Sequence, residues 1–233
     1  MISIVVPTYN EEEHIKEMIE ALLNLGEIEI IIAEDGSTDD TRKIIEEFLG
    51  RCDNVIISSE QNRRGKGAAI KRGLGVADCD IFGFIDADLA THPNELLKLK
   101  EEIDKGFDIA IGSRNLPDSK ITKRQPFHRI LLGNLYRNIV RSMLKVDVYD
   151  LQCGCKLFKR EVWENVDVEC DGFAFDTEFL AKANAKGYKI SEVPIMWRNS
   201  EDSKVDPIKD TVHMFRTVLR VRSEIGAGED FKR

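Results

Sequence analysis

Two aspartates, Asp86 and Asp88, directly follow an apolar run over residues 81–85. Alternate residues of an extended chain point to the same side, so the two carboxylates are expected to lie close together. Neighbouring carboxylates repel, and each raises the pKa of the other. A divalent cation such as Mg²⁺ or Mn²⁺ relieves this repulsion and usually keeps coordination sites for phosphate oxygens. We therefore predict a metal or diphosphate site at this pair; the alternative is a helix N-cap with a surface acid ahead of Pro93.

The first half of the chain alternates between short apolar runs and segments of helical periodicity. This pattern predicts an α/β fold with a mostly parallel, Rossmann-like sheet and helices on both faces. Ligands of such sheets bind beyond the carboxyl ends of the strands, which is where the polar residues of this sequence collect. The expected strands are 2–10, 27–35, 54–59, 81–85 and 108–113, and the expected helices are 11–25, 37–49, 66–77 and 94–104.

The second half is less regular, but no linker separates it from the first. We therefore expect a single domain over residues 1–225, followed by a flexible tail over 226–233. Residues 115–125 are expected to form a loop. The further expected helices are 126–146, 173–187 and 207–223, and the further expected strands are 151–160 and 188–199.

Residues after the first two expected strands are suited to a nucleoside. Tyr9 follows Pro7, and an aromatic ring in this place can stack against a flat base while Glu11 accepts a hydrogen bond from it. Asp35 can accept hydrogen bonds from a base or a ribose. The structural alternatives are a turn in which Asn10 caps the following helix and, for Asp35, an ordinary turn residue.

Several cations can hold phosphate groups. Lys66 opens a helix within a Gly-Lys-Gly segment, but the spacing is not that of an ATP phosphate loop. Arg114 ends a strand at the ligand edge, and Arg198 and Lys204 flank a polar loop that can close over a site. Arginine is favoured for bidentate contacts with phosphate. For each cation alone the alternative is an ordinary solvated side chain.

The composition excludes several classes of function. A net charge of −8 over 233 residues argues against nucleic acid as a partner. No apolar run approaches the roughly 20 residues of a membrane span, and no leader is recognisable, so a cytoplasmic location is expected. The five scattered cysteines are expected to be reduced, with Cys153 and Cys155 as core residues. No histidine, serine or cysteine pattern indicates an activated nucleophile.

The motifs together resemble a known family. The order VVPTYNEEE, EDGSTDDT, GKGAAIKRG, DADLATHP, IGSR, PFHR, LQCGCKLFKR, FAFDTEFL, VPIMWRN and SK spans residues 2–205. It resembles the polyprenyl-phosphate sugar synthases of glycosyltransferase family two, and within them the dolichyl-phosphate glucosyltransferase and mannosyltransferase branch.

The resemblance implies a GT-A fold, a nucleotide-sugar donor (UDP-glucose or GDP-mannose) and an Mg²⁺ or Mn²⁺ ion. It also implies a role for each matching residue. Ala90 departs from the mannosyl enzymes, in which a glutamine at this place helps to bind the metal. The implied nucleoside residues are Pro7, Tyr9, Glu11, Asp35 and the adjacent Ala33; Asp86 and Asp88 address the ribose, diphosphate and metal; Arg114 and Arg129 lie around the phosphates; and Arg198 and Lys204 clamp the donor.

The chemistry expected of such an enzyme needs no strong base. A lipid monophosphate is already ionised near neutral pH and can attack the sugar C1 in line, which inverts it, while cations including Lys66 stabilise the diphosphate. Asp176 is a candidate for the acceptor side or a sugar hydroxyl; the alternative is a structural acid paired within its helix. With a soluble or glycan acceptor, Asp176 is the candidate base. A non-catalytic nucleotide-binding subunit is the remaining alternative.

Two amphipathic segments, 126–146 and 207–222, carry arginines on their polar faces. They can contact the cytoplasmic face of an anionic membrane, or the chain can use a separate membrane subunit. The alternative is that both helices simply pack on the sheet, which we expect for most of their apolar surface.

Overall fold

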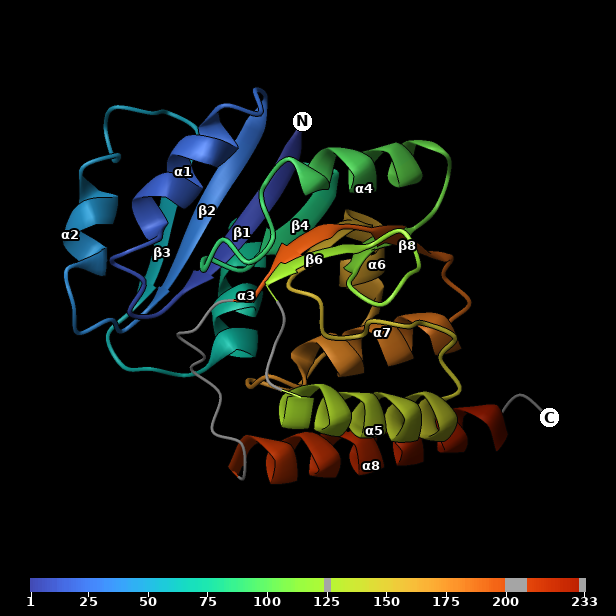
Figure 1. Ribbon diagram of the computed structural model, residues 1–233. Coiled ribbons are helices and arrows are strands. Elements are labelled where there is room, and N and C mark those ends of the chain that lie inside the picture. The colour runs from blue at the N-terminus through green and yellow to red at the C-terminus, as the bar shows by residue number, and fades with distance from the viewer. Residues whose placement is uncertain (124–126, 200–208, 231–233) are drawn as a thin grey trace.

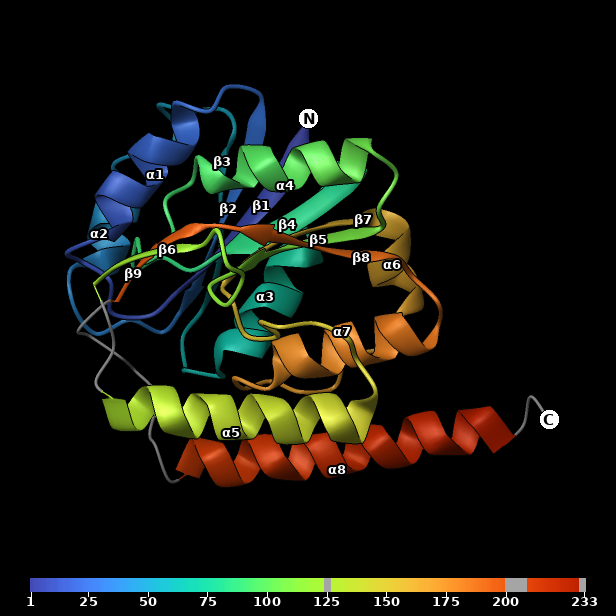
Figure 2. The ribbon, with the colours of Figure 1, turned by 45° about the vertical axis from the view of Figure 1, so that its right-hand side comes forward.

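The computed structural model describes residues 1–123, 127–199 and 209–230, with side chains except at 127–132, 209–210 and 227–230. Its main sheet has seven strands in the order β3-β2-β1-β4-β7-β5-β8. Figure 1 shows this sheet between the helices, and Figure 2 labels its strands. This confirms the expected α/β architecture. The strands are β1 (Ile2–Thr8), β2 (Ile28–Asp35), β3 (Val55–Glu60), β4 (Ile81–Ile85), β5 (Ile109–Ser113), β7 (Cys155–Lys159) and β8 (Ile190–Pro194).

Strand β7 is the exception to the parallel pattern. It lies between β4 and β5 and runs antiparallel to both. Its first residue, Cys155, is therefore opposite Ile85, the last residue of β4. The segment that precedes β7 is thereby delivered to the carboxyl end of β4, next to Asp86, whose backbone N–H donates to the Gly154 carbonyl at 2.9 Å.

Helices cover both faces of the sheet, because the strands carry apolar side chains on both faces. One core lies under α1, α2 and α4, and the other lies under α3, α6 and α7. Helices α5 and α8 lie side by side outside α7 (Figures 1 and 2). The helices are α1 (Ile15–Leu23), α2 (Thr41–Glu46), α3 (Lys66–Leu74), α4 (Glu95–Asp104), α5 (Phe127–Leu144), α6 (Arg160–Asn165), α7 (Phe175–Ala185) and α8 (Lys209–Asp230).

The second half contains α6, a helix that was not expected, and its strands also differ from the expectation. Residues 115–125 were expected to form a loop, but they contain β6 (Lys120–Lys123), which pairs with β9 (Met196–Arg198) in a separate two-stranded sheet. The single strand expected over 188–199 is accordingly split between β8 and β9. The chain leaves the main sheet after Pro194, the last residue paired with β5. Local sequence cannot show this change of partner.

The chain ends in a longer helix than expected, since α8 continues to Asp230. The flexibility of residues 226–233 stays a prediction. All five cysteines are free thiols, and Cys153 and Cys155 are fully buried, as expected. In the part of the chain that the structure describes, no helix has the length and apolarity that a membrane crossing requires.

Candidate functional site

The carboxylate pair lies at the carboxyl end of β4, where ligands of parallel sheets bind. Asp88 accepts a hydrogen bond from the Ala90 N–H at 3.0 Å, and Leu89 between them has a φ of 54°. Burial, together with the negative charge of Asp86, raises the pKa of Asp88. The repulsion predicted from the spacing of the two aspartates is therefore present in the structure.

Gly154 makes room for Asp86. A Cβ atom added to Gly154 would lie 1.8 Å from Asp86 Oδ2, so an alanine here would displace this carboxylate. The segment Cys153-Gly154-Cys155 therefore has a structural role in the site. Its cysteines pack in the core, and its glycine positions an acid of the site.

A line of alternating charges leads from Asp86 into the interior. Lys66 Nζ lies 2.7 Å from Asp86 Oδ1 and 3.7 Å from Asp176 Oδ2. Lys156 Nζ lies 2.5 Å from Asp176 Oδ1 and donates to the Cys153 carbonyl. Burial by itself lowers the pKa of Lys66, but the attraction of Asp86 and Asp176 outweighs it and raises the pKa above its ordinary value.

Asp176 is only 2% exposed, and each of its oxygens faces a lysine. This geometry favours a structural role for Asp176 over the role of a base that contacts the substrate. The two lysines, however, come from α3 and β7 rather than from the helix of Asp176. A catalytic role for Asp176 stays a prediction.

Sequence reasoning missed Lys156, which is fully buried in β7. A signal was present, because strand alternation places Lys156 on the same face as Phe158, an apolar core residue. A lysine on a buried strand face requires a partner. Nothing local in the sequence indicates that the partner is Asp176, twenty residues away.

Arg114 lies at the end of β5, as predicted, and is bound by Asp150. Its Nε and Nη2 atoms donate to the two carboxylate oxygens at 2.7 Å each, and its backbone N–H donates at 2.8 Å. Burial raises the pKa of Asp150, but Arg114 outweighs this and holds it below the usual range. The charge of Arg114 is balanced in this structure, so a phosphate contact stays a prediction.

The residues expected to hold a nucleoside lie at the ends of β1 and β2, which pair side by side. The ring of Tyr9 is covered by the guanidinium of Arg63 at 4.1 Å from its centre, and Glu11 contacts His14 at 3.1 Å. Asp35 accepts hydrogen bonds from the backbone N–H groups of Arg64 and Gly65, at 3.0 and 2.8 Å. Ligand binding by these residues stays a prediction, and Arg63 was not foreseen.

Ala33 and Asn10 lie at the same edge. Ala33 is fully buried and packs in the core, and its expected place beside the nucleoside stays a prediction. The cap expected at Asn10 is wrong, because α1 begins at Ile15 after His14. Instead Asn10 has a φ of 53° and accepts a hydrogen bond from the Thr38 N–H at 2.8 Å, which ties the two strand-end loops together.

The remaining predicted site residues, one proline and three cations, lie in different parts of the chain. Pro7 lies in β1 beside Ala33. Arg198 ends β9, and its N–H donates to the Ala90 carbonyl at 2.9 Å, so it adjoins the turn that holds Asp88. Arg129 lies in α5, but its side chain is outside the described residues, and so is the whole of Lys204. Their roles stay predictions.

The site offers a divalent cation two carboxylates. Among the described residues there is no group of three histidine, cysteine or acidic side chains that could hold a metal. Two hard oxygen donors that repel each other nevertheless suit Mg²⁺ or Mn²⁺ when phosphate oxygens complete the coordination. The donor set therefore fits an ion that binds together with a nucleotide.

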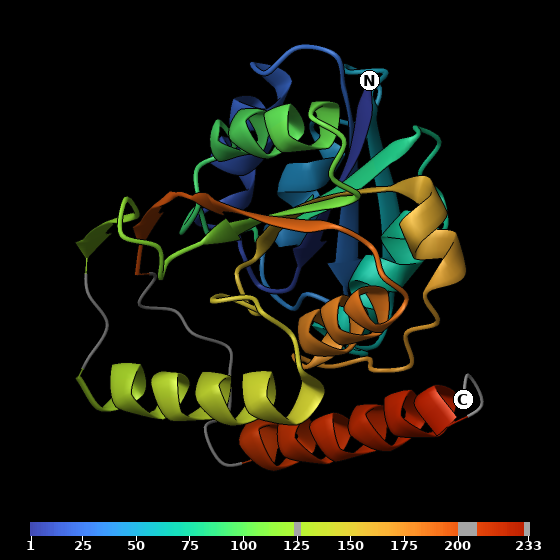
Figure 3. The same cartoon turned by 90° about the vertical axis from the view of Figure 1, so that its right-hand side faces the viewer.

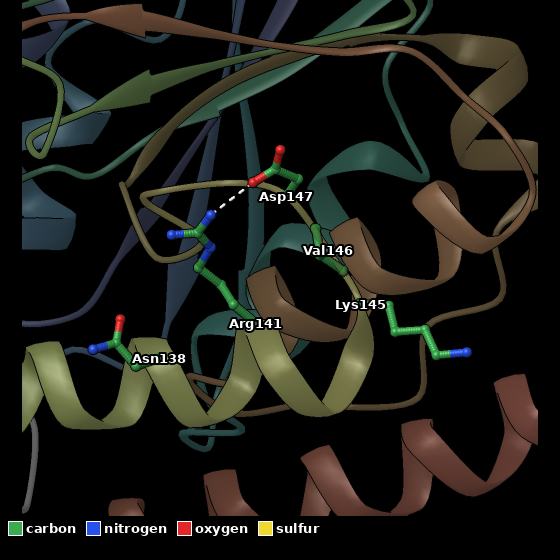
Figure 4. Close-up of a pocket in the computed structure, with 5 residues that line it drawn as sticks. All are labelled: Asn138, Arg141, Lys145, Val146 and Asp147. Atoms are coloured by element: carbon green, nitrogen blue, oxygen red, sulfur yellow. Dashed lines mark hydrogen bonds and ion pairs between the residues drawn. The ribbon is translucent and has the colours of Figure 1, made fainter.

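A separate shallow pocket of about 350 Å³ lies at the C-terminal end of α5 (Figure 4). Arg141 on its wall pairs with Asp147 at 2.6 Å. None of the predicted site residues lines it. The full lining is Asn138, Arg141, Lys145, Val146 and Asp147.

Comparison with known proteins agrees with this geometry. The model of the family described as Glycosyl transferase family 2 matches residues 3–167. The glycosyltransferase AglD of Haloferax volcanii is 35% identical over 229 residues, which cover 94% of this chain and 36% of that protein. The chain thus spans about a third of the length of that relative.

Two other relatives match over more of their length. A dolichyl-phosphate β-glucosyltransferase of Dictyostelium discoideum is 30% identical over 95% of this chain and 73% of its own. A polyprenol monophosphomannose synthase of Mycolicibacterium smegmatis is 29% identical over 85% of this chain and 77% of its own.

Among solved structures, glucosyl-3-phosphoglycerate synthase from Mycobacterium tuberculosis, in complex with Mn²⁺, UDP and glucosyl-3-phosphoglycerate, superposes with a TM-score of 0.71. The alignment covers 97% of this chain and 79% of that one at 21% identity, which compares the folds alone. It confirms the expected GT-A fold. The chain therefore belongs to glycosyl transferase family 2 and is a glycosyltransferase.

Proposed function

We propose that the chain is an inverting glycosyltransferase that moves a hexose, glucose or mannose, from a nucleotide sugar to a polyprenyl phosphate such as dolichyl phosphate. The observation that carries the proposal is the repelling pair Asp86 and Asp88 at the carboxyl end of β4, with Lys66 beside it. The names of the relatives support the lipid phosphate as acceptor.

The donor binds along the edge formed by β1, β2 and β4. Tyr9 stacks against the base once the guanidinium of Arg63 moves aside, because Arg63 is exposed and Tyr9 is half-buried. Asp86 and Asp88 would hold Mg²⁺ or Mn²⁺, which would supply positive charge against the diphosphate. The side chain of Ala90 would add no ligand, so binding of the ion would depend on the substrate as well. Further phosphate contacts come from Arg114, Arg129, Arg198 and Lys204.

The acceptor phosphate attacks the sugar directly. Its anionic oxygen forms the new bond to C1 while the bond from C1 to the diphosphate oxygen breaks, and the nucleoside diphosphate leaves with the electron pair. No proton has to be removed from the acceptor, because its oxygen is already ionised. The burial of Asp176 beneath Lys66 agrees with a reaction that needs no base.

The chain meets its lipid acceptor at the surface formed by α5 and α8. Inner residues of both helices, including Val140 and Val218, are buried in the core, which is the packing expected of most of their apolar surface. Three side chains of α8 at helical spacing nevertheless stay 40–49% exposed, and Figure 3 shows this helix at the outside of the molecule. These three are Val212, Phe215 and Leu219.

Two exposed arginines, Arg216 and Arg222, lie on the same helix. Apolar and cationic side chains together suit peripheral contact with an anionic membrane, so we place the chain at the cytoplasmic face of one. Arg220 does not contribute, because it pairs with Glu178 at 2.9 Å and with Glu169 at 2.6 Å. A separate membrane subunit could also cover this surface.

A donor screen tests the proposal. UDP-glucose and GDP-mannose, each labelled in the sugar, are incubated with dolichyl phosphate vesicles and Mg²⁺ or Mn²⁺, and label in the lipid phase is counted. Asp88→Ala should lower turnover by at least 100-fold, since it removes a ligand that stabilises the leaving group. Asp78→Ala is the control, because Asp78 is 97% exposed.

Unchanged turnover of Asp88→Ala would remove the metal role of this pair. Transfer only to water-soluble acceptors would replace the lipid with a soluble or glycan acceptor. Nucleotide binding without transfer from either donor would favour a non-catalytic subunit.

A further inference from the structure

Lys66 lies between two acids and can reach both. Its Nζ atom is 2.7 Å from Asp86 and 3.7 Å from Asp176, and its side chain is 15% exposed. Asp86 belongs to the carboxylate pair at the edge of the sheet, whereas Asp176 lies in the interior. The position that a divalent cation would take at Asp86 is thus already next to a cation of the chain itself.

We propose that Lys66 is a tethered counter-ion shared between Asp86 and Asp176, and that it yields Asp86 to a divalent cation by moving fully to Asp176. Asp176 and Lys156 are then positioning residues, which determine where Lys66 can go. The proposal rests on the metal role of Asp86 and Asp88 in the proposed function.

The backbone of Lys66 is fixed, so only its side chain can move. A Cβ atom on Gly65 would lie 2.5 Å from the Asp171 carbonyl oxygen, and one on Gly67 would lie 2.4 Å from the Cys170 carbonyl oxygen. The first turn of α3 therefore packs directly on residues 170–171. The four-carbon stem of lysine still lets the ammonium travel the roughly 1 Å that separates its present position from a full ion pair with Asp176.

Asp176 has one oxygen available for Lys66. Lys156 Nζ binds Oδ1 at 2.5 Å, whereas Oδ2 is the atom that faces Lys66. Lys156 is fully buried and also donates to the Cys153 carbonyl, so Asp176 cannot follow Lys66 towards the surface. Because Lys156 already balances the charge of Asp176, Lys66 is left closer to Asp86 than to Asp176.

This arrangement predicts opposite effects for two substitutions that break the same ion pair. Lys156→Met leaves Asp176 without its partner, so it should draw Lys66 inward and tighten metal binding at Asp86. Asp176→Asn removes the inner partner, so it should leave Lys66 on Asp86 and weaken metal binding. Lys66→Met removes the competing cation and should tighten metal binding by roughly tenfold.

The test uses the full chain and Mn²⁺, with and without UDP or GDP, and no sugar. Bound Mn²⁺ is measured from the loss of the electron paramagnetic resonance signal of the free ion. The affinity is compared among wild type, Lys66→Met, Lys156→Met, Asp176→Asn and Asp88→Ala. Lys100→Met is the control, since Lys100 pairs with Asp104 at the surface of α4. We expect severalfold changes of opposite sign for Lys156→Met and Asp176→Asn.

A direct electrostatic effect of Asp176 on the metal is separated by repeating its substitution in the Lys66→Met background. If Lys66 carries the effect, Asp176→Asn should then change Mn²⁺ affinity by less than about twofold. An equal effect in both backgrounds, or no tightening by Lys66→Met, would overturn the proposal. Lys66→Met leaves the buried pair of Lys156 and Asp176 intact. Its Mn²⁺ affinity therefore tests the proposal even if the other variants fail to fold.

The two proposals can fail separately. The metal site of the proposed function is wrong if wild type binds no Mn²⁺, or if Asp88→Ala binds Mn²⁺ as well as wild type does. In either case the proposed role of Lys66 is wrong too. If Asp88-dependent binding is present but insensitive to Lys66→Met, only the counter-ion role is wrong.

Discussion

Two parts of the site differ in how their residues are held. At the ends of β1 and β2, Tyr9 and Glu11 are partly exposed and contact the side chains Arg63 and His14. Around β7, Lys156 and Asp150 are buried, and each forms an ion pair with a residue of another element. The first part can rearrange around a ligand, whereas the second is fixed before any ligand binds.

The difference leads to opposite expectations for mutants. Removing a buried ionic partner leaves an uncompensated charge, which is strongly destabilising. Removing an exposed side chain that contacts a ligand changes binding and leaves the fold nearly intact. Four experiments, beginning with the largest expected effect, test this difference between the residues at the ends of β1 and β2 and those around β7.

Asp150→Ala should lower the free energy of unfolding by about 3 kcal/mol, because it leaves Arg114 without its bidentate partner. Denaturant unfolding measures the change. Asp147→Ala is a matched control three positions away, since Asp147 pairs with Arg141 but is 93% exposed, and less than about 1 kcal/mol is expected there. Equal losses in the two variants would contradict the division between the two parts.

Gly154→Ala should reduce sugar transfer by roughly 100-fold, since the added Cβ would displace the Asp86 carboxylate. Steady-state kinetics with the donor found in the screen measures it. Gly133→Ala is the control, because its Cβ would meet nothing within 4 Å and an alanine within a helix should stabilise by about 0.5–1 kcal/mol. Full activity of Gly154→Ala would show that the position of Asp86 is not critical.

Tyr9→Ala should raise the KM for the donor by roughly tenfold, the usual value of stacking one base on an aromatic ring. Its free energy of unfolding should change by less than about 1 kcal/mol, because Tyr9 is partly exposed. Kinetics and denaturant unfolding of the same preparation check both halves. A large loss of stability with an unchanged KM would show that Tyr9 has a structural role and does not bind the donor.

The smallest effect is expected on acidification below about pH 4. Arg114 holds the pKa of Asp150 below its usual range, so the stability from this pair is fully present above about pH 4, the value for an unfolded chain. It is lost as the pH falls through the depressed pKa of the folded state. As the pH falls below about 4, the free energy of unfolding of Asp150→Asn should therefore decrease less than that of wild type. If the two proteins show the same slope of unfolding free energy against pH, the ion pair of Asp150 and Arg114 does not contribute this stability.

The fold of the first half could be predicted because its signals are local. Strands β1, β2 and β4 read as apolar runs followed by polar residues, and parallel topology brings their ends together without knowledge of distant contacts. Asp86 and Asp88 were found in this way. The same reasoning failed for Asn10, where the positive φ depends on what packs against the residue.

The rest of the site could not be predicted because it depends on the partners of β7. Its antiparallel insertion between β4 and β5 brings Gly154 beneath Asp86 and places Lys156 against Asp176. Nothing in the local pattern of residues 151–160 indicates strand direction or neighbours. For the same reason Asp150, the partner of Arg114, could not be identified from sequence spacing.

Anomalous diffraction at the manganese edge shows directly where the leaving group is held. Crystals would be grown with Mn²⁺ and the nucleoside diphosphate of the preferred donor. We expect an anomalous peak coordinated by Asp88, with the diphosphate on its other side and Lys66 paired with Asp176. A manganese peak that touches the diphosphate but neither Asp86 nor Asp88 would contradict this expectation.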